Sequence, residues 1–516
     1  MNSINVSPAL PARRNGRRGA PCLKLAGTVA AAFALVACAQ IPDVRPYARM
    51  RDGASLGLPQ ASQVADEKAS PGSVAAQSDA LASEAWWQAL GSTELNALIE
   101  EAMSAQPRLG VARARWTRAQ AALAQTQTRQ QPSVNASADA TYQHYTANGA
   151  IPRPLAGSER ISGNLQLTGS WEWDFFGKNQ AAIDAMQDQA QAAQADMAAT
   201  RLLLASQIAS AYVELARLGE QEKLAERALA QRLEIFRLVQ ARVKAGLDTA
   251  VELRQSEGAI PDARVQLALV QERNRAIRLA LAALMGRPQS ADQIRGSELA
   301  GFQKPAPALT LPADLLGRRA DVAAAKWRVQ AAMHDVVQAR AQFYPNLNLV
   351  AFAGLSSIGI DRLIQTGSQQ WGVGPALRLP LFDGGFLRAQ LASRSADLDA
   401  AIETYNATVV DAVSEVARQL NAENAAAEQR SEQASALNLA ESAYGLALER
   451  YRAGLGNYLQ VLSAENLVLA QRRSGVDLWA RSLDTAIGLM RALGGGYAES
   501  PLPQSSLAQA AVLSRP

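Results

Sequence analysis

The chain has 516 residues, long enough for two to four domains or one elongated body. Only 5% of its residues are aromatic, and the abundance of Ala, Gln and Leu favours long helices over a sandwich or a compact enzyme core. The formal charge is +4, but five basic and no acidic residues precede residue 38, so the remainder is nearly neutral, which argues against nucleic acid as a partner.

The N-terminal residues have the pattern of a bacterial export signal. After a basic stretch, residues 25–37 form an apolar run that is too short to span a bilayer but suits a signal peptide. Cys38 follows at once, as in bacterial lipoprotein signals, where cleavage allows the cysteine to be acylated. A chance cysteine is the alternative, but it would leave an unpaired thiol in an oxidising compartment. We therefore predict a signal peptide at 1–37 and a lipid group on Cys38.

Residues 38–83 are polar, with scattered Pro, Gly and Ser and no period, which is typical of an extended tether. Beyond them no run approaches eighteen apolar residues, so the sequence predicts no transmembrane helix. If the chain crosses a membrane, it must do so as strands.

The rest of the chain contains two internal repeats, separated by about 210 residues. Residues 131–135 (QPSVN) match 344–348 (YPNLN), and residues 243–247 (VKAGL) match 451–455 (YRAGL). Each repeat is predicted to run as helix, strand, strand, long helix, glycine turn and helix. The predicted limits are 84–300 for the first repeat, 301–497 for the second and 498–516 for a C-terminal tail.

Strict alternation of apolar and polar residues at 161–175 predicts a strand with one apolar and one polar face. Residues 135–145 are its predicted partner, and 346–355 and 371–382 are the strands of the second repeat. A soluble hairpin would alternate too, but aromatic residues gather at these strand ends, as in strands that cross a bilayer. Because about eight strands is the minimum for a barrel, the barrel must be shared between subunits. Three copies would supply twelve strands with polar faces lining a lumen.

Two helices are predicted to be too long for a globular core. Residues 178–244 and 388–450 contain no proline, and each would extend for about 100 Å. Their apolar residues recur at intervals of three and four, which predicts close packing against neighbouring helices. The shorter helices would stack end to end in pairs to match these lengths. The predicted pairs are 248–286 with 313–342, and 456–493 with 107–131.

These features resemble the TolC-type outer-membrane factors, in the lipoprotein group often called NodT-like. The similar segments follow the family order over residues 86–497. Residues 354–374, together with the last two segments given below, are most similar to the branch serving multidrug and aromatic-acid (fusaric-acid-type) exporters. The segments are 86–99 (WWQALGSTELNALI), 171–177 (WEWDFFG), 311–322 (LPADLLGRRADV), 343–345 (FYP), 451–454 (YRAG), 379–385 (LPLFDGG) and 489–497 (LMRALGGGY). The resemblance implies a mainly helical homotrimer in which a twelve-stranded membrane β-barrel, four strands per chain, continues into a periplasmic conduit of twelve helices.

The resemblance also implies a passive exit duct for drugs or small toxic organic compounds. The chain would be anchored by its lipid in the cell outer membrane and extend into the periplasm. A periplasmic adaptor (membrane fusion protein) and an inner-membrane pump of the RND, MFS or aromatic-acid exporter type would complete the route. Catalysis, cofactors and metals are not expected, because His144 and His334 lie far apart in the sequence without cysteine partners. The alternatives are a type I secretion duct and a structural coiled-coil periplasmic lipoprotein or adaptor.

The tips of the two helical hairpins are the predicted contact with the adaptor. Glycine at a tip is explained by the positive φ of a helix end. The flanking basic residues would pair with acidic groups of the adaptor, or would simply be favoured by the helix dipole. The predicted contact residues are Gly246, Leu247, Asp248, Gly454, Leu455, Gly456, Arg242, Lys244, Arg450 and Arg452.

Just past each tip, the closed state of the family resembles an iris of polar and acidic residues that face the axis. The matching positions are Glu252 in the first repeat and Gln460 and Ser463 in the second. Family members often have Asp at the latter two positions. The resemblance therefore implies a periplasmic gate with less negative charge than is usual in the family.

Overall fold

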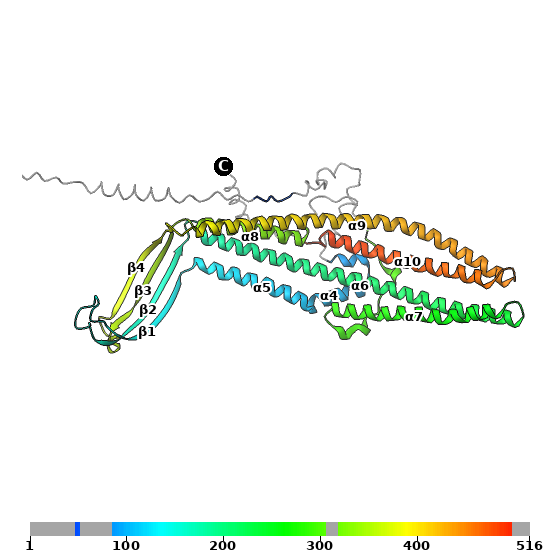
Figure 1. Ribbon diagram of the computed structural model, residues 1–516, viewed down its shortest axis with the longest axis horizontal. Helices are drawn as coiled ribbons and strands as arrows, with labels where there is room; N and C mark the ends of the chain where they lie inside the picture. Colours follow the sequence, from blue (N-terminus) through cyan, green and yellow to red (C-terminus); the bar gives the residue numbers. More distant parts are fainter. Residues whose placement is uncertain (1–46, 52–84, 306–317, 498–516) are drawn as a thin grey trace, which may run out of the picture.

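The computed structural model describes residues 47–51, 85–305 and 318–497. Figure 1 shows an elongated molecule with a sheet at one end and two helical hairpin tips at the other. The predicted signal peptide, the lipidation site Cys38 and the C-terminal tail lie outside the described residues. No described helix is both long and apolar enough to cross a membrane.

The order of elements in the two repeats is the predicted one. The first repeat contains η2 (Trp86–Leu90), α4 (Thr93–Ala105), α5 (Pro107–Gln127), η3 (Thr128–Gln130), β1 (Ser133–His144), β2 (Glu159–Trp173), α6 (Lys178–Lys244), α7 (Ala250–Leu284), η4 (Pro288–Gln293) and η5 (Leu299–Gly301). The second contains α8 (Ala320–Ala341), β3 (Asn346–Ile358), η7 (Ile360–Arg362), β4 (Gln369–Arg378), α9 (Phe386–Arg452) and α10 (Tyr458–Ala492).

The four strands form one antiparallel sheet in the order β1-β2-β3-β4. Its two faces differ in polarity because side chains alternate along each strand. On one face Trp171 lies opposite Leu349, and on the other Asp139 lies opposite Asn164. The predicted alternation is confirmed. β4 ends at Arg378 rather than at the predicted residue 382, because Pro380 has no N–H to donate to a ladder.

The first long helix, α6, has the predicted limits and 67 residues. The second, α9, also has 67 residues and extends two residues beyond the predicted range 388–450 at each end. Its earlier start is explained by Asp383, whose carboxylate accepts the N–H groups of Gly385 (2.9 Å) and Leu387 (2.8 Å) and so satisfies donors of the first turn.

The short helices stack end to end, but the predicted pairs are wrong. α5 lies in line with α7, and α8 lies in line with α10 (Figure 1). A β-carbon at Gly286, after α7, would lie 3.3 Å from Pro107 at the start of α5. Arg319, before α8, donates a hydrogen bond of 2.8 Å to the carbonyl of Ala492 at the end of α10. Similar lengths therefore gave the wrong pairing, because length does not say which helix ends meet.

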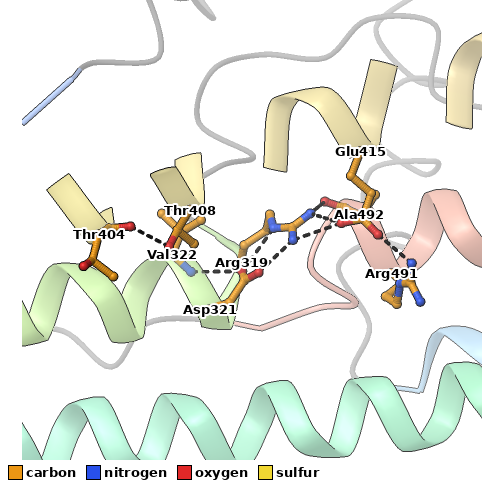
Figure 2. Close-up of polar contacts among 8 residues, drawn as sticks. All are labelled: Arg319, Asp321, Val322, Thr404, Thr408, Glu415, Arg491 and Ala492. Atoms are coloured by element: carbon orange, nitrogen blue, oxygen red, sulfur yellow. Dashed lines mark hydrogen bonds and ion pairs between the residues drawn. The ribbon is translucent and has the colours of Figure 1, made fainter. Parts of the chain in front are cut away.

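A polar cluster at residue 319 joins α8, α9 and α10, and we call it the Arg319 junction (Figure 2). The guanidinium of Arg319, whose residue is 9% exposed, donates to Asp321 (2.7 Å), to Glu415 (3.1 Å) and to the Ala492 carbonyl. Arg491 donates to the second oxygen of Glu415 at 2.6 Å. Burial alone would raise the pKa of Asp321 and of Glu415, but the arginines outweigh burial and hold both below their ordinary values.

The largest apolar core lies at mid-height, where the short segments η2, α4 and η5 pack against α6, α7 and α10. Trp86, Ile99 and Tyr212 in this core are at most 2% exposed. The hydroxyl of Tyr212 donates to Glu94 at 2.7 Å, which ties α6 to α4. This apolar core packs the helices together at the middle of the bundle, and the two hairpins extend beyond it.

A buried acid in α6 predicts a pH-dependent stability. Asp188 is 7% exposed, its Oδ2 atom accepts no hydrogen bond, and this atom lies 3.5 Å from Nε2 of His334 on α8. Burial, together with the nearby carboxylate of Asp184, raises the pKa of Asp188 to about 7. Because the folded state favours the neutral acid, the wild-type chain loses stability as pH rises from the ordinary carboxyl range through about 7.

We therefore expect Asp188→Asn, which mimics the neutral acid, to raise the melting temperature in detergent at pH 8 and to leave it unchanged at pH 4. The matched control is Asp196→Asn on the same helix, since the Asp196 side chain is 50% exposed. An Asp188→Asn effect of equal size at both pH values would contradict this assignment.

Candidate functional site at the hairpin tips

The two hairpins end in turns of the same geometry. Gly246 and Gly454 have φ of 72° and 77°, in the left-handed region that favours glycine. The N–H of Leu247 donates to the carbonyl of Arg242 (2.9 Å), and the N–H of Leu455 donates to that of Arg450 (2.8 Å). Both contacts satisfy carbonyls at a helix C-terminus. Leu247 and Leu455 are 65% and 70% exposed, so each tip presents an apolar side chain to its surroundings.

The charged residues predicted at the tips fall into two groups. Lys244, Arg450 and Arg452 are exposed, as an adaptor contact requires. Arg242 and Asp248 face each other instead, with Nε–Oδ2 and Nη2–Oδ1 distances of 3.0 and 3.2 Å. Their side chains are only 11% and 9% exposed. The structure therefore pairs these two charges within the first hairpin.

Tyr451 connects this ion pair to the second hairpin. Its hydroxyl donates to Oδ2 of Asp248 at 2.5 Å, and Nη1 of Arg242 donates to its carbonyl at 3.0 Å. The Arg242 guanidinium also lies over the Tyr451 ring, 4.5 Å from the ring centre. Tyr451 is fully buried. We call Arg242, Asp248 and Tyr451 the interhairpin clamp, because they tie the α6–α7 hairpin to the α9–α10 hairpin.

The protonation states in the clamp favour its hydrogen bonds. Burial alone would raise the pKa of Asp248, but the hydrogen bonds from Arg242 and Tyr451 outweigh burial and hold it below the ordinary value. Burial and the hydrogen bond to Asp248 both raise the pKa of Tyr451. At neutral pH the carboxylate is therefore ionised and the phenol keeps its proton. The clamp weakens only as pH falls below the ordinary range of an aspartate.

Of the predicted gate residues, Glu252 and Gln460 lie on the first turns of α7 and α10, and Ser463 lies on the second turn of α10. The carboxylate of Glu252 accepts the N–H of Thr249 at 2.9 Å, and Thr249 in turn accepts the N–H of Val251, so the pair caps α7. The N–H of Gln460 donates to the capping side chain of Asn457 at 3.0 Å. Gln460 and Ser463 are exposed. Within the chain, Glu252 thus stabilises the start of its own helix.

A second tie between the hairpins was not predicted. Arg232 on α6 donates to Asp262 on α7 (3.0 Å) and to Asn466 on α10 (3.1 Å). Glu465, which is 2% exposed, has its Oε2 atom 4.0 Å from Nε of Arg232. The sequence does contain a sign that Tyr451 is special. The matching residue of the first repeat is Val243, so only the second repeat has a hydroxyl at this position. For Arg232 and Glu465 we find no such signal.

Nothing in this geometry resembles a catalytic centre. In residues 47–51, 85–305 and 318–497, no three His, Cys, Asp or Glu side chains converge to hold a metal ion. The contacts at the tips are instead those of two hairpins held together by polar side chains. While these contacts are formed they oppose movement of one hairpin relative to the other, and breaking them permits it.

Comparison with known proteins agrees with this geometry. The family model of outer membrane efflux proteins matches residues 98–287 and 311–495. OpmQ of Pseudomonas aeruginosa, a pyoverdine export outer membrane protein, is 32% identical over 427 residues, 82% of this chain and 90% of OpmQ. MdtQ of Escherichia coli, a putative multidrug resistance outer membrane protein, is 31% identical over 80% of this chain and 88% of MdtQ. The crystal structure of VceC from Vibrio cholerae superposes with a TM-score of 0.76 at 35% identity, covering 81% of this chain and 100% of VceC. The chain therefore belongs to the outer membrane efflux protein family, as its resemblance to the TolC-type factors implied.

Proposed function

We propose that this chain is the outer membrane channel of a tripartite efflux system, a passive exit duct for drugs or small toxic organic compounds. The observation that carries the proposal is the continuity of a two-faced sheet with long helices that end in two tied hairpins (Figure 1). Two relatives, a pyoverdine export protein and a putative multidrug resistance protein, support small organic cargo. The pump would select the compound, and the duct would work without catalysis or a cofactor.

The sheet supports a duct made of three chains. Strands β1 and β4 are its edges, and unpaired backbone groups along an edge are costly in a bilayer. Joining β4 of one copy to β1 of the next satisfies these groups, and three copies give a closed sheet of twelve strands. Trp371, Val373 and Leu377 on the apolar face are 79%, 67% and 70% exposed, as suits contact with lipid. The lipid group proposed on Cys38 would add an anchor in the same membrane.

The tips support contact with a periplasmic adaptor. Three copies would present six tips, each with an exposed leucine on a glycine turn. The exposed Lys244, Arg450 and Arg452 would attract acidic side chains of the adaptor. The adaptor would in turn join the duct to a pump of the RND, MFS or aromatic-acid exporter type in the inner membrane.

The interhairpin clamp supports a closed resting state. The α9–α10 hairpin cannot move away from α6–α7 without breaking the contacts that Tyr451 makes with Arg242 and Asp248. Glu252, Gln460 and Ser463 would lie at the narrow end of the duct, on the first two turns of the helices that follow the tips. Engagement of the tips by the adaptor would supply the energy that separates the hairpins.

The function is tested by deleting the gene in a strain that lacks other outer membrane efflux channels. We expect deletion to raise accumulation and lower the minimum inhibitory concentration for part of a panel of dyes, antibiotics and aromatic acids. A wild-type copy should restore both, and a Cys38→Ala copy should restore them less well. A wild-type copy that changes accumulation of no compound in the panel would contradict the proposed function.

A further inference from the structure

We propose that Phe352 forms an aromatic contact site for cargo inside the lumen of the sheet. The inference rests on the proposed function, because only a duct of several copies places the polar face of the sheet around a lumen. It adds a property of the duct itself, namely a preference for cargo with a flat aromatic ring.

The register of the sheet places Phe352 on the polar face. Phe352 lies opposite Thr168 of β2 and Gly372 of β4, and two residues away Val350 lies opposite Ser170 and Gly374. Among the described residues of the four strands, Phe352 is the only aromatic side chain on this face. Every tryptophan of the strands lies on the opposite, apolar face. The position of this one ring is therefore not explained by contact with lipid.

The ring lies directly over a glycine. A β-carbon at Gly372 would lie 2.6 Å from Cε1 and 2.9 Å from Cζ of Phe352, closer than side chains can approach. A β-carbon at Gly374, two residues further along the same strand and face, would meet nothing within 4 Å. Val350, Phe352 and these two glycines therefore make an apolar spot on the polar face, in which one edge of the ring rests on the backbone of Gly372.

The surroundings of the spot are strongly polar. Gln370, two residues before Gly372, donates to Asn164 at 3.0 Å, and Asn164 donates to Asp139 at 3.2 Å. This chain of hydrogen bonds crosses β3 at Gly354, which has no side chain to block it. A hydrated lumen wall thus carries one isolated aromatic surface, and Phe352 itself is half-buried.

An isolated ring in a polar wall has a definite binding chemistry. It cannot hydrogen-bond, but it can stack with the ring of a passing molecule and remove apolar surface of both from water. Three copies would place three such rings at one level of the duct. Stacking is weak enough to allow release, which suits a duct better than a tight site.

Covering a glycine is also a way to stabilise a sheet, so the test must separate the two roles. The probes are phenylacetamide and cyclohexylacetamide, which are neutral and similar in size but differ in aromaticity. Each is added to single channels of the purified full-length chain in planar bilayers, on the side of loops 145–158 and 359–368. We expect phenylacetamide to reduce the current at a concentration about three- to tenfold lower than cyclohexylacetamide does.

Four variants make the assignment specific. Phe352→Leu should abolish the difference between the two probes, and Phe352→Tyr should keep it. Gly372→Ala should displace the ring into the lumen and lower the conductance without probe, whereas the matched Gly374→Ala should not. Trp371→Leu, which removes an aromatic ring from the apolar face, should leave the difference between probes unchanged.

The outcomes distinguish this proposal from the proposed function. If the wild-type chain forms channels but Phe352→Leu conducts normally and keeps the preference for phenylacetamide, the aromatic site is refuted and the duct is not. If Phe352→Leu fails to form channels, Phe352→Tyr and Gly372→Ala decide. Loss of the preference for phenylacetamide in Phe352→Tyr, or a conductance of Gly372→Ala equal to that of Gly374→Ala, would refute the site. A wild-type chain that forms no channel would refute the duct itself.

Discussion

Replacing Asp248 with alanine is expected to raise the ratio of open to closed channels by roughly one to two orders of magnitude, since a hydrogen bond to a charged group contributes about 1.5–3 kcal/mol. Asp248 accepts from Arg242 and from Tyr451, and both donors would be left without their acceptor. The hairpins touch in the proposed closed state, so the loss of these hydrogen bonds destabilises the closed state relative to the open one. The change is measured as open probability of the purified chain in planar bilayers.

A matched control removes an acid from the same hairpin without touching the clamp. Glu257 on α7 pairs with Arg254, and these side chains are 52% and 77% exposed. Exposed pairs of this kind contribute little, so Glu257→Ala should leave the open probability unchanged. Equal open probabilities in Asp248→Ala, Glu257→Ala and the wild-type chain would show that the clamp does not hold the closed state.

Replacing Arg319 with alanine is expected to lower the free energy of unfolding by about 3–5 kcal/mol, the usual cost of removing one partner from a buried ion pair. The guanidinium is shared by Asp321, Glu415 and the Ala492 carbonyl (Figure 2), and all three would lose a donor in a partly buried site. The stacking of α8 on α10 would weaken with it. Denaturant unfolding in detergent, followed by helical circular dichroism, measures the effect.

Two further variants separate this junction from a general loss of charge. Arg328→Ala, on the same helix α8, removes a partner of Asp196, but these side chains are 44% and 50% exposed, so little change is expected. Arg319→Lys keeps the charge and should recover only part of the stability, because lysine lacks the planar fork that reaches three acceptors. An Arg319→Ala chain as stable as Arg328→Ala would contradict the structural role of the junction.

The junction also predicts how stability responds to acid. Since the pKa values of Asp321 and Glu415 are lowered in the folded chain, their contribution is complete above the ordinary carboxyl range and is lost as pH falls through the folded-state values. The wild-type chain should therefore lose more stability on acidification than Arg319→Ala, in which Asp321 loses its main pKa-lowering partner and Glu415 keeps only Arg491. The same unfolding measurement at pH 7 and at pH 3 compares the two.

Sequence patterns predicted the elements better than their contacts. Alternation at 161–175 predicted both faces of β2, and uninterrupted helical residues predicted the limits of α6, because these properties are local. The end-to-end pairing of the short helices depends on which ends meet, and the residues that join them, such as Gly286 with Pro107, lie far apart in the sequence. Helix length alone could not identify those contacts.

At the candidate site, too, the local backbone was predicted and the contacts between distant residues were not. The glycine turns at Gly246 and Gly454 were predicted with their φ, because a helix end dictates the backbone there. Asp248 was predicted as a surface contact, whereas the structure turns it toward Arg242 and Tyr451. Tyr451 lies 203 residues from Asp248, and whether they meet depends on the rotation of two long helices about their axes. This rotation cannot be predicted from the pattern of neighbouring residues in the sequence.

If the clamp holds the proposed duct closed, cargo leaves only when the two hairpins separate there. The most direct test of this links cysteines at positions 248 and 451 with a short, reducible thiol-reactive linker, and measures export of a compound that the deletion strain accumulates. We expect the linked chain to stop exporting and to resume when the linker is reduced, while Asp248→Cys alone, treated identically, continues to export. Export by the linked chain at the rate of the unlinked double variant would contradict the account.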